Sequence, residues 1–155
     1  MKEKLKGFVP HIIAIVAFII LSAIYFYPVL GGKALVQSDN IQALGMAHEI
    51  TQYEEQSGEL SSWTNSMFGG MPAWNIGVPQ NSNLMTYVNR ILNVGFPHPI
   101  GAVFISMLGF FILLLVLGCK TWISFIGALA YGFTSYLFIV IGAGHNSKAV
   151  AMAYM

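Results

Sequence analysis

Asp39, in the motif SDNIQ between two apolar segments, is the first candidate for chemistry in this chain. A carboxylate at such a place can act as a general base, or can cap a helix that begins beside it. If residues 41–56 form a continuous helix, the 3.6-residue period places Gln42 on the side of Asp39 and His48 on the opposite side. Asp39 and His48 therefore cannot form a catalytic pair within one regular helix.

A second group of candidates lies near the end of the chain, in GAGHNSKAVAMAYM. His145 and Lys148 are three residues apart and would share one face of a helix, where they could bind a phosphate. The segment is not a phosphate-binding P-loop, because it lacks the GxxxxGK[ST] pattern and a preceding strand. The same two side chains would equally fit a membrane interface, with their polar ends reaching toward water.

The composition indicates a membrane protein. Hydrophobic residues make up 56% of the chain and charged residues 8%, and the mean hydropathy is +0.68. A soluble domain carries about 25% charged residues. A formal charge of +1 without a basic face excludes nucleic-acid binding. The single cysteine, Cys119, excludes a disulfide framework and a metal-spaced Cys/His set.

The hydropathy pattern predicts an all-α integral membrane protein. Three apolar segments, residues 11–30, 100–119 and 122–142, are each long enough to cross a bilayer. The lysines of residues 1–10 place the N-terminus in the cytoplasm, and hence residues 31–99 outside. A cleaved signal peptide is the rival interpretation of the first segment, but its length and the lack of a small-x-small cleavage site favour a span.

The rest of the chain fits around these three spans. Ala128 and Gly132 form a small-xxx-small pair that would let a neighbouring helix approach the third span closely. Residues 143–155 form an external turn and then become apolar again, as if a fourth span began. We therefore expect the chain to be the N-terminal part of a longer protein.

The external segment is expected to contain two helices, over about residues 40–56 and 83–94. Between them, residues 61–79 combine Gly, Pro, Asn and Trp without a helical or strand period, which is typical of an ordered loop. The second helix carries an apolar stripe opposite a polar face that includes Arg90. This stripe fits a helix on the membrane surface and a helix packed on the loop equally well.

The motifs SDNIQ, WTNSMFGGMP and GHNSKAVAMAYM, in this order around the predicted spans, resemble the N-terminal part of the bacterial YfhO family of membrane proteins, especially the Bacteroidetes-type forms. The resemblance covers essentially the whole chain. It implies a GT-C-like glycosyltransferase in the bacterial inner membrane, with the first loop periplasmic or extracellular. Such enzymes take a sugar from a polyprenyl-phosphate donor at the external face and pass it to an envelope glycan or lipid acceptor.

The resemblance also implies roles for individual residues. Asp39 lies where enzymes of the GT-C class have an acidic residue after the first span, so it is the expected catalytic base. The phosphate candidates are Lys148, His145 and Arg90, while Gln42 and Trp63 are further substrate-binding candidates, Trp63 by stacking on a sugar ring. The simpler interpretations are that Asp39 caps a helix and that the tryptophans form the core of the loop.

Two further expectations concern metals and the alternative function. Asp39 is followed by Asn40, not by a second acid, so the acidic pair that holds a metal in several GT-C enzymes is missing and a divalent metal is doubtful. No cofactor is expected. The alternative function is a non-enzymatic membrane component that binds a lipid or polymer, or that serves transport or assembly. Transport is the weaker form, because no ionisable residue lies in the middle of a predicted span.

Overall fold

The computed structural model describes residues 2–76, 84–93 and 95–155, which are mostly helical. The chain divides into two compact units. Residues 1–35 and 85–155 form the first, and residues 36–84, inserted between these two segments in the sequence, form the second. The first unit carries the apolar segments, and the second carries most of the polar segment that separates the first two of them in the sequence.

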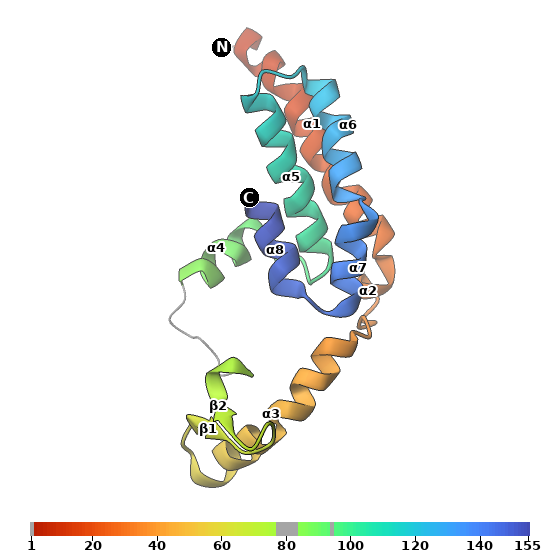
Figure 1. Cartoon of the computed structure of the whole chain (residues 1–155). Coiled ribbons are helices and arrows are strands. Elements are labelled where there is room, and N and C mark those ends of the chain that lie inside the picture. The colour runs from red at the N-terminus through yellow and green to blue at the C-terminus, as the bar shows by residue number, and fades with distance from the viewer. Residues whose placement is uncertain (1, 77–83, 94) are drawn as a thin grey trace. The chain divides into compact units, whose positions relative to one another are not determined.

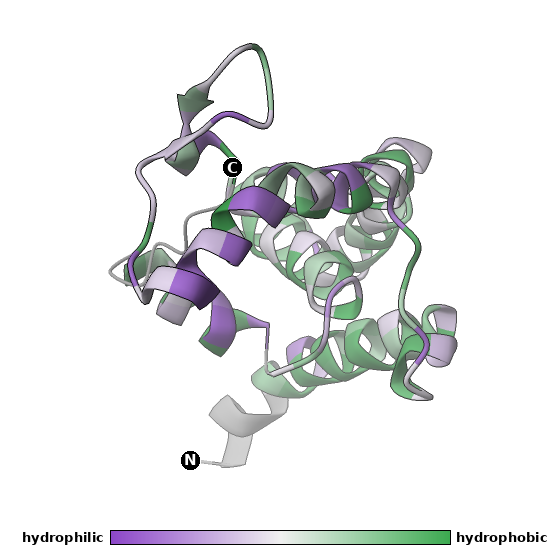
Figure 2. Ribbon diagram, turned by 90° about the horizontal axis from the view of Figure 1, so that it is seen from below, coloured by the Kyte–Doolittle hydropathy of each residue, from purple (hydrophilic) through white to green (hydrophobic). Residues whose placement is uncertain are grey.

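The first unit is a helical bundle built from the apolar segments. Helices α1, α5 and α6 pack against one another, and α8 packs against α5 and α7 (Figure 1). In chain order its helices are α1 (Lys2–Tyr25), α2 (Tyr27–Leu30), α4 (Leu84–Leu92), α5 (Ile100–Val116), α6 (Thr121–Gly132), α7 (Ser135–Ala143) and α8 (Asn146–Tyr154). Figure 2 shows these helices coloured mostly as hydrophobic.

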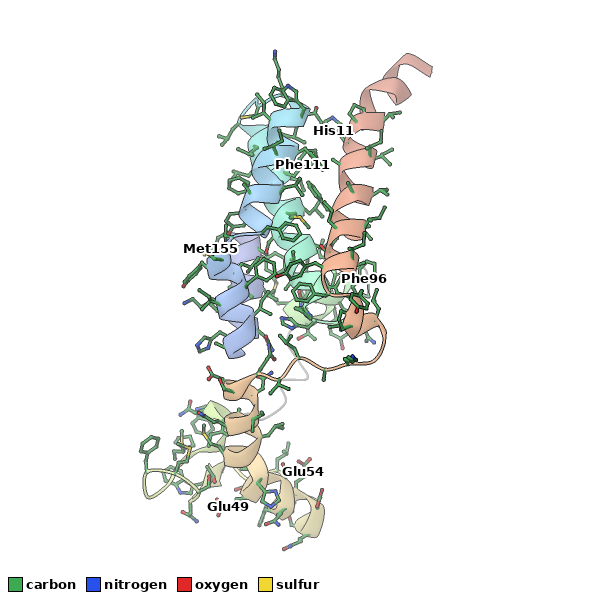
Figure 3. All side chains as sticks on the ribbon, turned by 90° about the vertical axis from the view of Figure 1, so that its right-hand side faces the viewer. His11, Glu49, Glu54, Phe96, Phe111 and Met155 are labelled. Atoms are coloured by element: carbon green, nitrogen blue, oxygen red, sulfur yellow. The ribbon has the colours of Figure 1, made fainter. Side chains whose placement is uncertain are left out.

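Aromatic rings fill the space between α1, α5 and α6. The side chain of Phe18 is fully buried. Its ring centroid lies 5.6 Å from that of Phe111 in an edge-to-face arrangement and 5.3 Å from that of Phe125 in a stacked one. About two turns before Phe18 on α1, His11 also faces Phe111, with the ring centroids 6.1 Å apart (Figure 3). These contacts attach α1 to the other two helices.

Glycines allow the helices of the bundle to approach closely. A Cβ atom at Gly132 of α6 would lie 2.1 Å from Cγ of Met107 on α5, and one at Gly109 of α5 would lie 2.6 Å from the carbonyl oxygen of Ala153 on α8. Ala128, one turn before Gly132, is fully buried. The pair Ala128 and Gly132 thus lies against a neighbouring helix, as the small-xxx-small spacing predicts.

Two helical segments in the described part of the chain, Gly7–Tyr25 and Thr121–Ala143, are long and apolar enough to cross a membrane. They are the structural indication of membrane association. Helix α5 is apolar but shorter, with 17 residues. The predicted third span, 122–142, is divided into α6 and α7, because the Thr134 side chain accepts a hydrogen bond from the Leu137 N–H at 3.3 Å and caps a new helix.

The second unit consists of one long helix and a short hairpin. Helix α3 (Ser38–Ser57) is the polar helix of Figure 2 and ends at Gly58, whose φ of 74° suits glycine. Strands β1 (Trp63–Thr64) and β2 (Met71–Pro72) pair antiparallel, followed by the 3₁₀ turn η1 (Ala73–Asn75). The predicted loop 61–79 thus contains a hairpin as far as it is described. Residues 77–79, and the ends 83 and 94 of the predicted helix 83–94, lie outside the described residues.

Candidate functional site

Asp39 lies in the first turn of α3, which begins at Ser38. Its side chain is half-buried, and its Oδ1 accepts a hydrogen bond from the Ser38 hydroxyl at 3.3 Å. The residue before the helix, at the N-cap position, is Gln37. A carboxylate in the first turn is stabilised by the positive end of the helix dipole. The carboxylate of Asp39 therefore lies at the start of α3, two residues after the N-cap residue Gln37.

Gln42 and His48 follow on the same continuous helix. Gln42 is exposed and comes three residues after Asp39, a spacing that keeps the two side chains on one face. His48 comes nine residues after Asp39, which at about 100° per residue places it on the opposite side. The helix α3 thus offers Asp39 and Gln42 together, and it keeps His48 away from them.

The three predicted phosphate-binding residues belong to the first unit. Arg90 is exposed in the last turn of α4, and His145 is exposed at the residue before α8. The Nζ atom of Lys148 lies 5.3 Å from the ring centre of Tyr136, within reach of a cation–π interaction. It stays a prediction that Arg90, His145 and Lys148 bind one phosphate close to Asp39.

Helices α4 and α8 are joined inside the first unit. The Tyr154 hydroxyl donates a hydrogen bond of 2.9 Å to Oδ1 of Asn89, the residue before Arg90. Tyr154 comes six residues after Lys148, so the backbones of these two residues are roughly 9 Å apart along α8. Arg90 and Lys148 are therefore carried by two helices that are attached to each other.

A pocket in the second unit contains a residue that the sequence did not mark as a candidate. Glu49 of α3 lines a cavity of about 270 Å³ together with Ile50, Tyr53, Ser61, Trp63 and Asn65. Oε2 of Glu49 accepts hydrogen bonds from the Thr64 hydroxyl and, at 2.9 Å, from the Asn65 N–H. Figure 3 shows Glu49 on α3, with Glu54 further along the helix. Glu49 thus fastens the hairpin to α3.

These hydrogen bonds change the acidity of Glu49. The Thr64 hydroxyl, and after it the backbone N–H of Asn65, lower the pKa of Glu49 below its ordinary value of 4.5, although partial burial opposes this. A lowered pKa means that the ionised form stabilises the attachment of the hairpin above pH about 4.5. This contribution is lost as the pH falls through the lower pKa of the folded state.

We therefore expect acid to release the hairpin before the bundle unfolds. Near-ultraviolet circular dichroism, followed from pH 6 downward, should show a loss of tryptophan signal below pH about 4.5. The variant Glu49→Gln keeps the shape of the side chain but not the ionisation, so it should show no such acid-dependent step. An identical step in this variant would mean that another group controls the change.

Trp63 is held in a fixed position at the edge of this pocket. Its Nε1–H donates a hydrogen bond of 3.3 Å to Oδ1 of Asn65. The indole also lies on the backbone of Gly70, where a Cβ atom would come within 2.6 Å of Nε1. The side chain is nevertheless 51% exposed. One part of the ring is thus supported by the hairpin, and another part is open to solvent.

The substitution Gly70→Ala is expected to displace the indole and to destabilise the hairpin by about 1–3 kcal/mol, because it combines an overpacked contact with a φ of 120°. Trp fluorescence and urea unfolding would measure the two effects. Gly69→Ala is the matched control, since Gly69 also has a positive φ but no atom near its Cβ position. Equal effects of the two substitutions would show that the indole contact is unimportant.

Charge is distributed unevenly along the chain. All acidic residues except Glu3 lie within residues 36–84, and none of the seven Lys and Arg residues does. The second unit is therefore strongly acidic, and it repels anions at neutral pH. The seven Lys and Arg residues all lie within residues 1–35 and 85–155.

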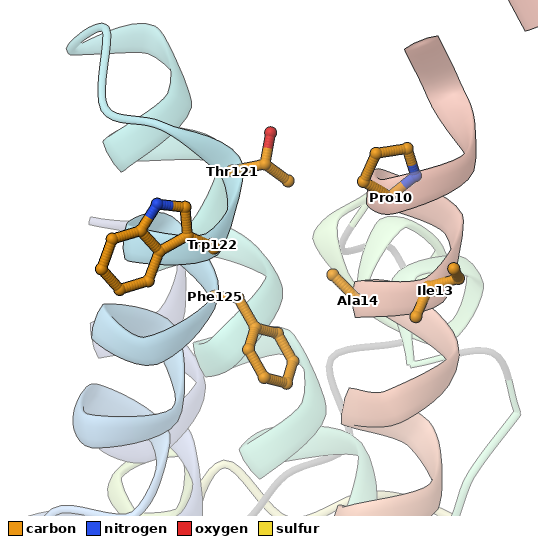
Figure 4. Close-up of a pocket in the computed structure, with 6 residues that line it drawn as sticks. All are labelled: Pro10, Ile13, Ala14, Thr121, Trp122 and Phe125. Atoms are coloured by element: carbon orange, nitrogen blue, oxygen red, sulfur yellow. The ribbon is translucent and has the colours of Figure 1, made fainter. Parts of the chain in front are cut away.

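Two other findings bear on ligands. No group of three or more His, Cys, Asp or Glu side chains that could hold a metal ion occurs among the described residues. The first unit contains an apolar cavity of about 490 Å³ between α1 and α6 (Figure 4). Its lining residues are Pro10, Ile13, Ala14, Thr121, Trp122 and Phe125. This cavity offers a hydrophobic surface but no group that could transfer a proton.

No protein-family model, curated protein or solved structure matches this chain. Over the described residues the protein is mostly helical, with two helical segments suited to a membrane and an inserted acidic unit. The resemblance of its motifs to the YfhO family stays a prediction.

Proposed function

We propose that this chain belongs to a membrane glycosyltransferase that moves a sugar from a polyprenyl-phosphate donor to a cell-envelope acceptor. The observation that carries the proposal is the place of Asp39. It lies in the first turn of α3, the first helix of a polar unit that follows the apolar α1 and α2. This is where the resemblance implies the catalytic acid of a GT-C-like enzyme.

The proposed arrangement places α1, α5 and the pair α6 and α7 across the bacterial inner membrane, with the N-terminus in the cytoplasm. Helix α5 has 17 residues, which reach roughly 26 Å and so lie at the lower limit for a span. Residues 36–84 and the start of α8 would then share the external side. The apolar cavity between α1 and α6 would lie toward the cytoplasmic end and would take no part in the reaction.

The proposed reaction needs a base on one side of the sugar and a stabilised phosphate on the other. The acceptor hydroxyl oxygen bonds to the anomeric carbon while the bond from this carbon to the phosphate oxygen breaks, and Asp39 takes the hydroxyl proton. Because residues 36–84 contain no Lys or Arg, the departing phosphate is assigned to Arg90, His145 and Lys148.

A second candidate function is favoured by the pocket around Glu49 and Trp63. The pocket combines aromatic and hydrogen-bonding side chains, as recognition sites do, and it does not include Asp39. A non-enzymatic component that binds a glycan or lipid for transport or assembly would need this pocket and no base.

The experiment that separates the two functions is a transfer assay with the complete protein in its own membranes. Lipid-linked sugar carrying a radioactive label is supplied, and the label that reaches envelope material is measured for the native protein and for Asp39→Asn. Loss of transfer at normal protein abundance supports the enzyme. Undiminished transfer overturns it and leaves the binding component.

A further inference from the structure

The pocket around Glu49 lies entirely within the second unit and has two kinds of wall. Tyr53 of α3 and Trp63 of β1 contribute aromatic rings. Glu49, Ser61 and Asn65 contribute a carboxylate, a hydroxyl and an amide. Small-molecule sites have this make-up, with rings that supply contact area and a few polar groups that orient the ligand.

The aromatic wall is both exposed and rigid. Trp63 is 51% exposed and Tyr53 47% exposed. The backbone of Gly70 supports the indole of Trp63, and Asn65 holds its Nε1–H. A ring fixed in this way loses little freedom when a ligand stacks on it. Its open part fits the C–H-rich face of a sugar ring, which is flat and apolar while the sugar edge is polar.

The polar wall can hydrogen-bond to the edge of the same ring. The Thr64 hydroxyl and the Asn65 N–H both donate to Oε2 of Glu49. A carboxylate has two oxygens with about four acceptor positions in all, so Glu49 can accept a further bond from a sugar hydroxyl. The lowered pKa of Glu49 keeps the group ionised, and hence an acceptor, at neutral pH. The Ser61 hydroxyl donates to the Trp63 carbonyl at 2.6 Å and accepts from the Trp63 N–H at 3.3 Å, so it holds the backbone of this wall in place.

Size and charge define the ligand more closely. The cavity of about 270 Å³ is slightly smaller than the roughly 300–1,000 Å³ of sites for drug-sized ligands, so it suits one ring. Glu54, Glu55 and Glu59 lie near it in the sequence, and no Lys or Arg occurs in residues 36–84. A sugar with a phosphate or carboxylate group would be repelled.

We propose that this pocket binds one uncharged sugar residue of a glycan. The proposal goes beyond the proposed function, because it concerns binding and requires no transfer. A sugar that is still joined to its lipid phosphate carries charge, so the proposed ligand of this pocket is a different sugar. The two proposals fail separately: Asp39→Asn should abolish transfer and leave this binding unchanged.

The test uses the full chain in detergent and saturation-transfer NMR with single sugars. The probes are the methyl glycosides of glucose, galactose, mannose and N-acetylglucosamine, with glucuronic acid and glucose 1-phosphate as charged counterparts. At least one uncharged glycoside should give a signal, and the charged sugars should not. Trp63→Ala should raise the dissociation constant roughly tenfold, which is the loss of affinity expected when one aromatic stacking contact is removed.

Two variants control for damage to the fold. Trp74→Ala removes a tryptophan that is also exposed, at 61%, but does not line the pocket, so it should bind as the native chain does. Trp63→Phe keeps a ring on Gly70 and should retain most of the binding. The proposal is overturned if no uncharged glycoside binds, if Trp63→Ala and Trp74→Ala bind equally, or if the charged sugars bind as well as the uncharged ones.

Discussion

Replacing Asp39 by asparagine is expected to lower the rate of sugar transfer by about 10²–10⁴-fold, the usual contribution of a general base. Asparagine has the same shape as aspartate, and its side-chain oxygen can still accept the hydrogen bond from the Ser38 hydroxyl. What it lacks is the ability to take a proton. The substitution therefore tests the chemistry of the carboxylate and leaves the start of α3 folded.

The matched control is Glu55→Gln, which removes the charge of an exposed acid on the same helix. It should transfer sugar at the native rate. Asp39→Glu, which keeps a base but moves it by one methylene group, should retain a measurable part of the activity. If Asp39→Asn and Glu55→Gln gave the same transfer rate at equal abundance in the membrane, Asp39 would have only its structural role in the first turn of α3.

Replacing Phe18 by alanine is expected to lower the free energy of unfolding of the bundle by about 3 kcal/mol, at the lower end of the range for a buried Phe→Ala change. The ring is fully buried and contacts Phe111 of α5 and Phe125 of α6, so its loss opens a cavity between three helices. In a lipid or detergent environment these packing contacts, and not the exclusion of water, hold helices together. Thermal unfolding in detergent would measure the change.

Phe8→Ala on the same helix is the comparison, because the Phe8 side chain is 64% exposed. It should lower the unfolding free energy by less than about 1 kcal/mol. A cavity at Phe18 should also accept a small apolar ligand, so added benzene is expected to restore part of the lost stability. If the two variants unfolded at the same temperature, the attachment of α1 to the bundle would have to come from other contacts.

Most helices could be predicted from the sequence because each follows an unbroken pattern. The first predicted span, 11–30, is an exception, because helix α1 ends at Tyr25 and α2 begins at Tyr27. The structure has helix over Ser38–Ser57, where the polar sequence has helix formers up to Gly58. The break between α6 and α7 was not predicted, since Phe133 and Thr134 fit an apolar segment as well as their neighbours do. The signal for it is local: the hydroxyl of Thr134 accepts a hydrogen bond from the backbone N–H three residues later, and so competes with the continuing helix.

The site was predicted only in part, because its main contacts join residues far apart in the chain. The place of Asp39 followed from the motif and the resemblance. The role of Glu49 did not, since its partners Thr64 and Asn65 lie 15 and 16 residues away and belong to a hairpin without a periodic pattern. Trp63 was a predicted candidate for stacking on a sugar, but the support of its ring by the bare backbone of Gly70 was not predicted. The periodicity of a sequence indicates which residues share one face of a helix, but it does not indicate which residues of a loop contact that helix.

The division of the last apolar segment into α6 and α7 limits how this part of the chain could cross a membrane. Helix α6 has 12 residues and α7 has nine, so they reach only about 18 Å and 14 Å, and neither can cross the hydrocarbon layer by itself. A membrane span formed by this part of the chain would therefore need α6 and α7 together, as one segment. The backbone N–H of Leu137, in the second half of this segment, has the Thr134 hydroxyl as its hydrogen-bond acceptor, so the break does not leave this group unsatisfied.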